Sequence, residues 1–539
     1  MGWFRRGKGA WDLESVEPPW EARVSIYEHV RAHVVAGVRG LTEGGERLPD
    51  EREDGELGFV AGGLDGAFGR HGGGGSNRSA AKLLHRLLRV VLDDASANKL
   101  EKLYDQLLEQ QSFEVVDPLL ERIVERRDLD TARLQALAVW LATRSPDREP
   151  VKFAIALLGT LSSREHQPLV SLLGRHEEFT LFAAVALSNL GGDEAEEALF
   201  ELARNVDGWG RIEVVERLAE TRNPVIKAWM LREGYKNSIM YEYLAYTCAV
   251  AGGLEQELEA PAPDRELLLG AGDILVALIT GGPAEDIDDY IDGAAVVERY
   301  LVHAWSNPSD LDVLITAARI GQFLDQEADW SQRASRGFTP KLREELRDKV
   351  AALKALPHWK PNVTAALSST DSRTFERATR AADALGIDTW EYYFARLEAG
   401  RGDGWYFVMQ TDDPGRLDRV LELAERRLPL DEIATGPAGE LGLGPKWVSH
   451  GYLDFVLQEL GRFPEKGWPL IRAGLRSPVT RNRHMALRAL STWELSTRPA
   501  DANAVLRKAL QDEPDDDVRE ELEAVLSGRP LVDKDDDDE

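Results

Sequence analysis

Cysteine is almost absent from this chain, since Cys248 is the only one among 539 residues. A disulfide within the chain is therefore excluded, and so is a zinc or iron–sulfur site built from several cysteines. Cys248 lies in the apolar run 246–250, so we expect it to be a small buried residue.

Long apolar runs are also missing. No stretch of about 18 or more apolar residues occurs, so we predict that no helix crosses a membrane. Residues 1–6 are followed by polar and acidic residues instead of the apolar core of a signal peptide. We therefore expect a soluble, cytoplasmic protein.

Basic residues are few relative to acidic ones. The chain has 65 Lys and Arg against 94 Asp and Glu, which gives a net charge of −29. Binding of nucleic acid or of an anionic membrane surface requires a basic footprint, so neither partner is expected. Hydrophobic residues make up 43% of the chain, which favours a folded protein over a disordered one.

What the sequence does contain is a repeat of 30 residues between positions 151 and 250. Its apolar members, which we expect to be buried, are Ile155, Val185, Val215 and Ala245. Its polar members, of types that cap helix N-termini, are Ser163, Asp193 and Asn223. Each unit is typical of two helices, the first ending near residues 160, 190 and 220. The pattern predicts an all-α fold, an α-solenoid of HEAT-like helix pairs with irregular loops.

Several helix boundaries follow from caps and prolines. We expect helix starts at Asp117-Pro118 and Asn223-Pro224, and a capping box formed by Asp193 and Glu196. Periodicity predicts a helix over residues 21–39. Beyond a break at 255–263, it predicts helices at about 264–280, 284–305, 309–324, 340–355, 372–384, 388–399 and 501–511.

The domain organisation is predicted from these boundaries. Residues 1–78 form an N-terminal helix plus a glycine-rich loop, and residues 79–260 form the repeat array. Residues 261–400 form a helical middle region. Residues 401–530 form a C-terminal region in which the segments 483–490 and 519–526 are two similar helices 36 residues apart. Residues 531–539 form an acidic tail that we expect to be disordered.

One acidic motif is typical of metal binding. Asp288, Asp289 and Asp292 have the DDxxD spacing. Residues 288 and 292 share a face if the segment is helical, and carboxylates suit Mg²⁺. The motif resembles that of all-helical isoprenoid synthases, which implies Mg²⁺-dependent binding of a diphosphate. The alternative is a solvated acidic helix start, which the helix dipole favours.

Three further segments are candidates for binding. The glycine-rich stretch 62–75, with Asp65 and His71, is either a binding loop or a flexible connector. The segments 390–412, with Trp405 and Tyr406, and 477–484 are candidates for a ligand or peptide groove. The second contributes Arg481, Arg483 and His484. The alternative for both is that the aromatic residues are core and the arginines pair with acidic residues.

The residues 226–237 (IKAWMLREGYKN), 241–245 and 477–493 resemble bacterial HEAT-like repeat proteins, some of which are labelled limonene hydroxylase. That label implies a monooxygenase. No haem, flavin or non-haem iron motif is present in the sequence, so we expect no cofactor.

No complete catalytic motif is found, and we assign no catalytic residue. We therefore expect a scaffold that holds a protein or peptide partner on its concave face. The alternative is an enzyme of isoprenoid or terpene metabolism in a helical framework, either a limonene hydroxylase-like monooxygenase or a diphosphate enzyme using Asp288, Asp289 and Asp292. A HEAT-like DNA glycosylase is disfavoured by the charge. The oligomeric state is not predicted.

Overall fold

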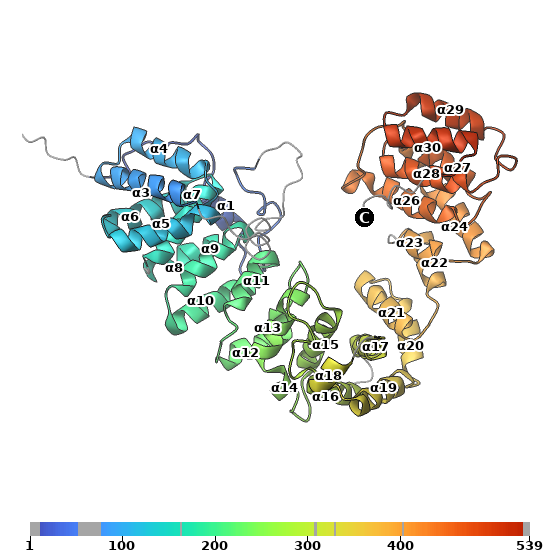
Figure 1. Ribbon diagram of the computed structural model, residues 1–539, viewed down its shortest axis with the longest axis horizontal. Helices are drawn as coiled ribbons and strands as arrows, with labels where there is room; N and C mark the ends of the chain where they lie inside the picture. Colours follow the sequence, from blue (N-terminus) through green and yellow to red (C-terminus); the bar gives the residue numbers. More distant parts are fainter. Residues whose placement is uncertain are drawn as a thin grey trace, which may run out of the picture. The chain divides into compact units, whose positions relative to one another are not determined.

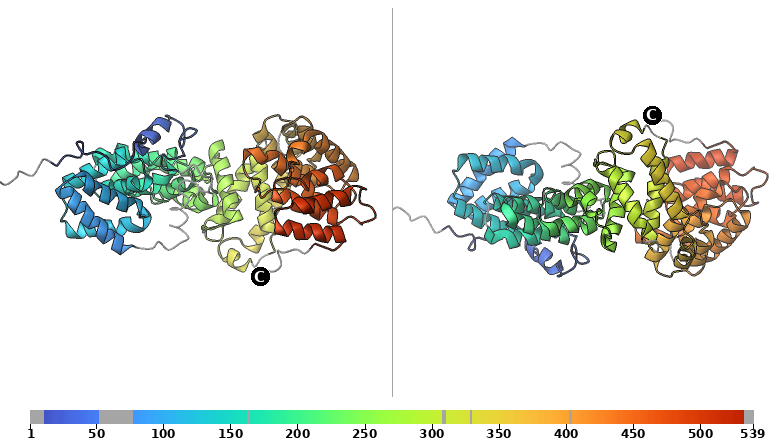
Figure 2. Two further views of the ribbon diagram at one scale, coloured as in Figure 1. Left: turned by 90° about the horizontal axis from the view of Figure 1, so that it is seen from above. Right: turned by 90° about the horizontal axis from the view of Figure 1, so that it is seen from below.

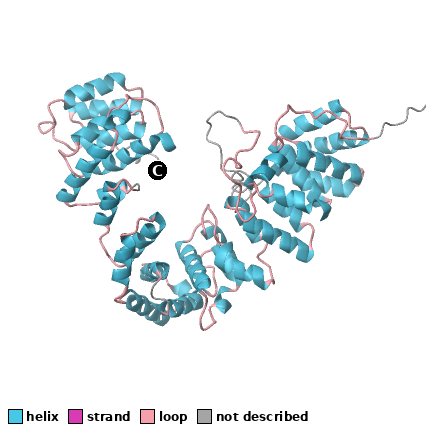
Figure 3. Ribbon diagram, turned by 180° about the vertical axis from the view of Figure 1, so that it is seen from behind, coloured by secondary structure: helices cyan, strands magenta, loops and turns pink. Residues whose placement is uncertain are grey.

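The computed structural model describes residues 11–51, 77–161, 164–306, 310–327, 330–401 and 404–531. Within these ranges the protein is helical and has no β-strand, which confirms the all-α prediction (Figures 1 and 3). The one isolated β-bridge found there pairs Glu440 with Val479. The chain forms two compact units, Met1–Leu356 and Pro357–Glu539. None of the described helices is both long and apolar enough to span a membrane.

The helices of unit 1 are α1 (Ile26–His33), α3 (Arg78–Asp93), α4 (Ala97–Leu108), α5 (Ser112–Arg126), α6 (Thr131–Arg144), α7 (Arg148–Thr160), η1 (Arg164–His166), α8 (Gln167–Leu173), α9 (Glu177–Ser188), α10 (Gly192–Asn205), α11 (Gly208–Glu216), α12 (Pro224–Trp229), the π-helical turn η2 (Met230–Gly234), α13 (Glu242–Gly252), α14 (Leu254–Glu257), α15 (Arg265–Thr280), α16 (Gly293–Trp305), α17 (Leu311–Asp325), α18 (Ser331–Ser335) and α19 (Pro340–Lys354).

Alternate helices of unit 1 contact one another in series. They form a continuous row of α3, α5, α7, α9, α11, α13, α15, α17 and α19 (Figures 1 and 2). Helices between them pack onto the row, with α6 on α7, α8 and α10 on α9, and α16 on α15 and α17. One apolar core runs through the whole unit, from Leu13 to Leu353. Each helix therefore buries its apolar side against neighbours, as in a stack of repeats.

The 30-residue spacing places most of its apolar members correctly. Ile155, Val215 and Ala245 are fully buried, but Val185 is 43% exposed, so its predicted burial is wrong. The reason is the register. Ile155 is the eighth residue of α7 and Val215 the eighth of α11, whereas Val185 is the ninth of α9. One residue turns the side chain by about 100°, and the true eighth residue, Ala184, is the buried one.

The predicted caps are only partly right. Asn223 does cap α12, since its Oδ1 accepts a hydrogen bond of 3.0 Å from the backbone N–H of Val225. Asp193 is not a cap, because α10 is already helical from Gly192. Glu196 forms no capping box and instead accepts a hydrogen bond of 2.6 Å from the Thr221 hydroxyl. Ser163 lies outside the described residues.

Three predicted helix starts also differ. Pro118 lies inside α5, which begins at Ser112. A proline there leaves the carbonyl of Glu114 without its helical partner, and the backbone N–H of Asn77 donates to that carbonyl instead, at 3.1 Å. The helix predicted over 21–39 is the shorter α1, which Ser25 caps. The helix predicted over 284–305 is shorter as well, because α16 begins only at Gly293.

Residues 11–51 run along unit 1 and are held by polar contacts to its helix ends. Arg148, at the start of α7, binds both carboxylate oxygens of Asp50 at 3.0 and 3.1 Å. Arg175 donates to the carbonyl of Val38 at 2.7 Å, and Gly40 donates its N–H to the carbonyl of Asn205 at 2.9 Å. The segment therefore contacts the start of α7, the turn between α8 and α9, and the end of α10.

Unit 2 contains α20 (Trp359–Leu367), α21 (Ser372–Ala384), α22 (Trp390–Glu398), α23 (Trp405–Met409), α24 (Pro414–Arg427), α25 (Leu430–Ile433), η3 (Pro445–Trp447), α26 (Val448–Leu460), α27 (Trp468–Gly474), α28 (Thr480–Ser491), α29 (Ala502–Asp512) and α30 (Asp516–Ser527). The predicted helices 372–384 and 388–399 correspond to α21 and α22. Contacts again form a row, here α23, α26, α28 and α30, with α27 and α29 packed on it.

Candidate functional site

A buried ion pair sits at the centre of the α28 and α30 region. Arg483 and Glu513 have side chains that are 1% and 0% exposed, and the guanidinium binds both carboxylate oxygens at 2.8 and 2.7 Å. Arg483 also donates to the carbonyls of Ala438, Ser477 and Pro478, at 2.9 to 3.1 Å. Arg483 was predicted to bind a ligand, but it is buried and instead binds three carbonyls of two backbone segments, the loop at 438 and residues 477–478.

The loop that precedes η3 is held over α28 by these contacts. Arg483 binds the loop at Ala438, and the backbone of Glu440 pairs with residues 478 and 480 at 3.2 Å on each side. Gly442 packs against Val479 so closely that an added Cβ would meet it at 2.8 Å. The neighbouring Leu441 is left 73% exposed. The backbone thus places Glu440 and Leu441 at the edge of a pocket.

This pocket has a volume of about 500 Å³, a size typical of ligand sites. It is bounded by α28, α30, the 440–441 loop and the segment after α30. Its lining residues are Glu440, Leu441, Thr480, Arg481, His484, Met485, Arg488, Asp517, Glu520, Glu521, Ala524, Arg529, Pro530 and Leu531. We call it the α28/α30 groove.

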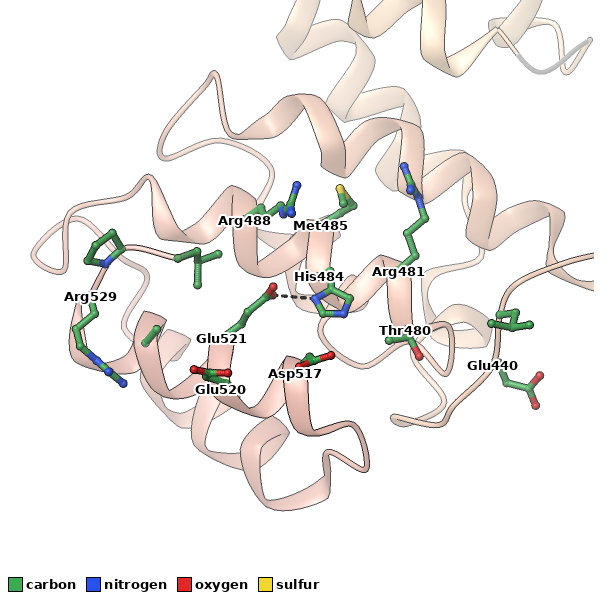
Figure 4. A pocket seen from close by; sticks show the side chains of 14 residues that line it. Glu440, Thr480, Arg481, His484, Met485, Arg488, Asp517, Glu520, Glu521 and Arg529 are labelled. Carbon is green, nitrogen blue, oxygen red and sulfur yellow. Dashed lines mark ion pairs between the residues drawn. The ribbon is translucent and has the colours of Figure 1, made fainter. Parts of the chain in front are cut away.

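The two helices carry opposite charge into the groove. Arg481, His484 and Arg488 extend from α28, while Asp517, Glu520 and Glu521 extend from α30, as Figure 4 shows. Between them lie apolar side chains, including Met485 and Ala524. The α28 wall is therefore basic and the α30 wall acidic, while Glu440 of the loop and Arg529 after α30 add charges of the opposite sign to the lining.

His484 joins the two walls. Its Nδ1 atom lies 3.0 Å from Oε2 of Glu521, and both side chains are about one quarter exposed (Figure 4). The close contact with the Glu521 carboxylate raises the pKa of His484 above its ordinary value, against the opposing effect of burial. The imidazole is therefore held in its charged form to higher pH than a free histidine.

Arg481 connects the groove to the next helix of the row. Its guanidinium binds Asp454 of α26 at 2.5 Å, and its side chain remains 61% exposed. The residue after Asp454, Phe455, contacts the ring of Tyr406 on α23 at 6.0 Å between centroids. The groove and the aromatic residues of α23 are therefore linked through adjacent residues of α26.

The aromatic segment divides into core and surface. Trp405 is 4% exposed and belongs to the core of unit 2, where the rings of Trp405 and Tyr452 lie 6.5 Å apart. Tyr406 is 42% exposed. Phe407 stacks on Tyr393 at 4.4 Å and is 49% exposed. Of the two residues predicted here, only Tyr406 presents a ring to solvent.

The DDxxD residues do not lie on a helix face, so that expectation is wrong. Asp288 and Asp289 precede α16, and Asp292 is its N-terminal flanking residue. Arg333 binds both oxygens of Asp288 at 2.6 and 2.8 Å, which lowers the pKa of that carboxyl. Asp289 accepts a hydrogen bond from the backbone N–H of Asp286. Among the described residues, no group of three or more His, Cys, Asp and Glu is arranged to hold a metal ion.

Asp65 and His71, with the glycine-rich stretch around them, lie outside the described residues. So do residues 532–539 of the acidic tail. Cys248 is fully buried, as predicted.

Sequence reasoning identified Arg481 and His484 but missed the residues of α30. A signal for them was present in the 36-residue spacing of the two similar helices. Adding 36 to the groove positions of α28, which are 481, 484, 485 and 488, gives 517, 520, 521 and 524, and all four line the groove. Equivalent positions of two adjacent repeats thus face one space.

Comparisons with known proteins do not supply a family. No protein-family model matches the chain. No curated protein matches it. Among solved structures, the crystal structure of an engineered protein covers 83% of this chain and 98% of its own, with 19% identity and a TM-score of 0.22. A match at that score supports no conclusion about a shared function.

Proposed function

We propose that the protein is a HEAT-like helical-repeat scaffold that binds a segment of a protein partner in the α28/α30 groove. The observation that supports this is the groove itself, in which repeat-equivalent residues of two neighbouring helices line one space. Repeat proteins use such rows of helices as binding surfaces, because side chains at equivalent positions form a continuous strip.

The construction of the groove favours a binding role. Its loop edge is fixed to the buried Arg483, so the binding surface is formed before a partner arrives. The exposed rings of Tyr406 and Phe407 provide apolar area at the far side of α26. Aromatic residues and arginines are enriched at protein interfaces, and both occur along this row.

The test uses a matched pair of charge reversals. Arg488 lies in the groove, and Arg507 lies on α29 outside it; both side chains are exposed. Tagged full-length wild type, Arg488→Glu and Arg507→Glu are each used to recover proteins from a lysate of the source cells. We expect one partner to be recovered by the wild type and by Arg507→Glu but not by Arg488→Glu. Equal recovery by all three proteins, or recovery of none, would contradict the proposal.

A further inference from the structure

A second pocket lies in unit 2, between the ends of α22 and α24 and the start of α26. It has a volume of about 590 Å³, within the range of small-molecule sites, and it shares no lining residue with the α28/α30 groove. Leu397, Trp405 and Leu428 are buried and form its inner part, whereas Gly400 and Arg427 are exposed and stand at its mouth. We call it the α22/α26 pocket.

Arg427 is the one charged side chain among the described residues that line this pocket. Its Nη2 atom donates to the carbonyl of Glu398, at the end of α22, at 2.5 Å. Its Nη1 atom lies against Gly400, where an added Cβ would be 3.7 Å away. The guanidinium is therefore held in place, yet within the described chain it forms no ion pair with a carboxylate.

Three neutral polar groups line the pocket together with Arg427. They are the indole of Trp405 and the hydroxyls of Ser449 and Tyr452, and none of them forms a hydrogen bond with another described residue. Trp405 is only 4% exposed, and a donor in so buried a side chain is costly to leave without an acceptor. Indole and guanidinium N–H groups can only donate, whereas a hydroxyl can donate or accept. A ligand of this pocket must therefore present hydrogen-bond acceptors.

We propose that the α22/α26 pocket binds a small organic acid. The carboxylate pairs with Arg427, whose planar guanidinium matches the geometry of that group, and it accepts hydrogen bonds from the neutral donors beside it. One guanidinium offsets one negative charge, which suits a single carboxylate better than a doubly charged phosphate. The apolar body of the acid packs against Leu397 and Leu428. This site is separate from the groove of the proposed function.

Two probes of nearly equal shape test the proposal with the full-length protein, phenylacetate and its neutral counterpart phenylacetamide. We expect isothermal titration calorimetry to show roughly ten-fold tighter binding of phenylacetate, because only the acid presents a charged acceptor. The net charge of −29 repels an anion, so it does not explain such a preference.

Matched variants locate the binding. Arg427→Met should remove the preference for the acid, whereas Arg426→Met, at an exposed neighbour that does not line the pocket, should retain it. Arg427→Lys keeps the charge and should keep most of the preference. Loss of the preference in both variants of Arg427, with a changed circular dichroism spectrum, would mean that Arg427 acts only by holding the carbonyl of Glu398, and the direct contact would be overturned.

Three further outcomes would overturn the proposal. The first is equal binding of the two probes, or no binding of phenylacetate, by the wild type. The second is an unchanged preference in Arg427→Met, since the acid would then bind elsewhere. The third concerns the source of the carboxylate. If acetyl-Ala-Ala-Phe with a free carboxyl terminus binds more tightly than phenylacetate, the ligand is the end of a protein chain and not a small acid. These variants leave the α28/α30 groove unchanged, so each outcome is independent of the proposed function.

Discussion

At the scale of single residues, Arg483 and Glu513 form an ion pair that is almost completely buried in unit 2. A fully buried ion pair gains little over an apolar pair of the same size, but removing one partner leaves a buried charge uncompensated. Here the arginine also binds three backbone carbonyls. Its loss would therefore leave several buried polar groups without partners.

We expect Arg483→Met to destabilise unit 2 by about 3–5 kcal/mol, because Glu513 then remains charged and buried. The double variant Arg483→Met with Glu513→Gln should recover part of this loss. Urea unfolding followed by circular dichroism measures both. An unfolding midpoint equal to that of the wild type would show that the pair carries little of the stability.

Glu177, at the start of α9, is half-buried, and its Oε2 atom lacks a hydrogen-bond partner among the described residues. Its carboxyl lies against Gly208, where an added Cβ would meet it at 2.2 Å. Burial is the main cause that raises its pKa, to about 8, and the nearby Asp207 and Glu46 add to the effect. The neutral acid is therefore the form that the fold prefers.

A pH-dependent prediction follows from this raised pKa. The stability that protonated Glu177 contributes is fully present below its ordinary pKa of about 4.5 and is lost as the pH rises through about 8. We expect Glu177→Gln, which stays neutral, to melt at a higher temperature than the wild type above pH 8. Below pH 4.5 the two should melt alike. A difference that is independent of pH would mean that Glu177 does not titrate in this range.

At the scale of helices, the repeat could be predicted from sequence because apolar residues recur with the spacing of helix pairs. Helix ends and caps that depend on local sequence could also be predicted. These are the end of α7, the cap at Asn223 and the bounds of α21. The cap at Ser25 depends on local sequence as well, but it was not predicted. Val185 was misplaced because α9 begins 29 residues after α7 and α11 begins 31 residues after α9, and a fixed spacing of 30 does not reveal that.

The candidate site was less predictable than the fold. Arg481, Arg483 and His484 were singled out by composition, but whether each side chain faces the core or the surface depends on partners distant in sequence. Glu513, which buries Arg483, lies 30 residues later. The pairing of Asp288 with Arg333 could not be predicted for the same reason, since Arg333 lies 45 residues away.

The register of α7 and α9 gives a paired prediction. Ile155→Asp places a carboxylate in the core of unit 1 and should abolish the cooperative unfolding of that unit. Burying an unpaired carboxylate costs more free energy than the folding of a typical domain provides. Val185→Asp, at the equivalent position by spacing, should change stability by about 0.5 kcal/mol or less, since that side chain faces solvent. Thermal melts of both variants measure the contrast. Equal destabilisation would show that α9 is rotated from the orientation described.

At the scale of the whole molecule, the protein has two hydrophobic cores. The first ends at Leu353 and the second begins at Trp390, and the described residues place no member of one in the other. Each unit buries its own row of helices, so each has the elements needed to fold by itself.

Separate cores predict separate unfolding. Leu457 is fully buried in unit 2, and Leu457→Ala should cost about 2–5 kcal/mol there. We expect calorimetry to show two transitions, of which only the one belonging to unit 2 moves to lower temperature. A common shift of the whole profile would indicate that the two units unfold as one.

The contact between Arg483 and the carbonyl of Ala438 has a practical consequence for genetics. An alanine scan for lost binding at the groove would score Arg483→Ala among its strongest hits, although the Arg483 side chain is buried and does not line the groove. Only a separate assay of folding would distinguish this buried structural arginine from Arg481 and Arg488, which line the groove.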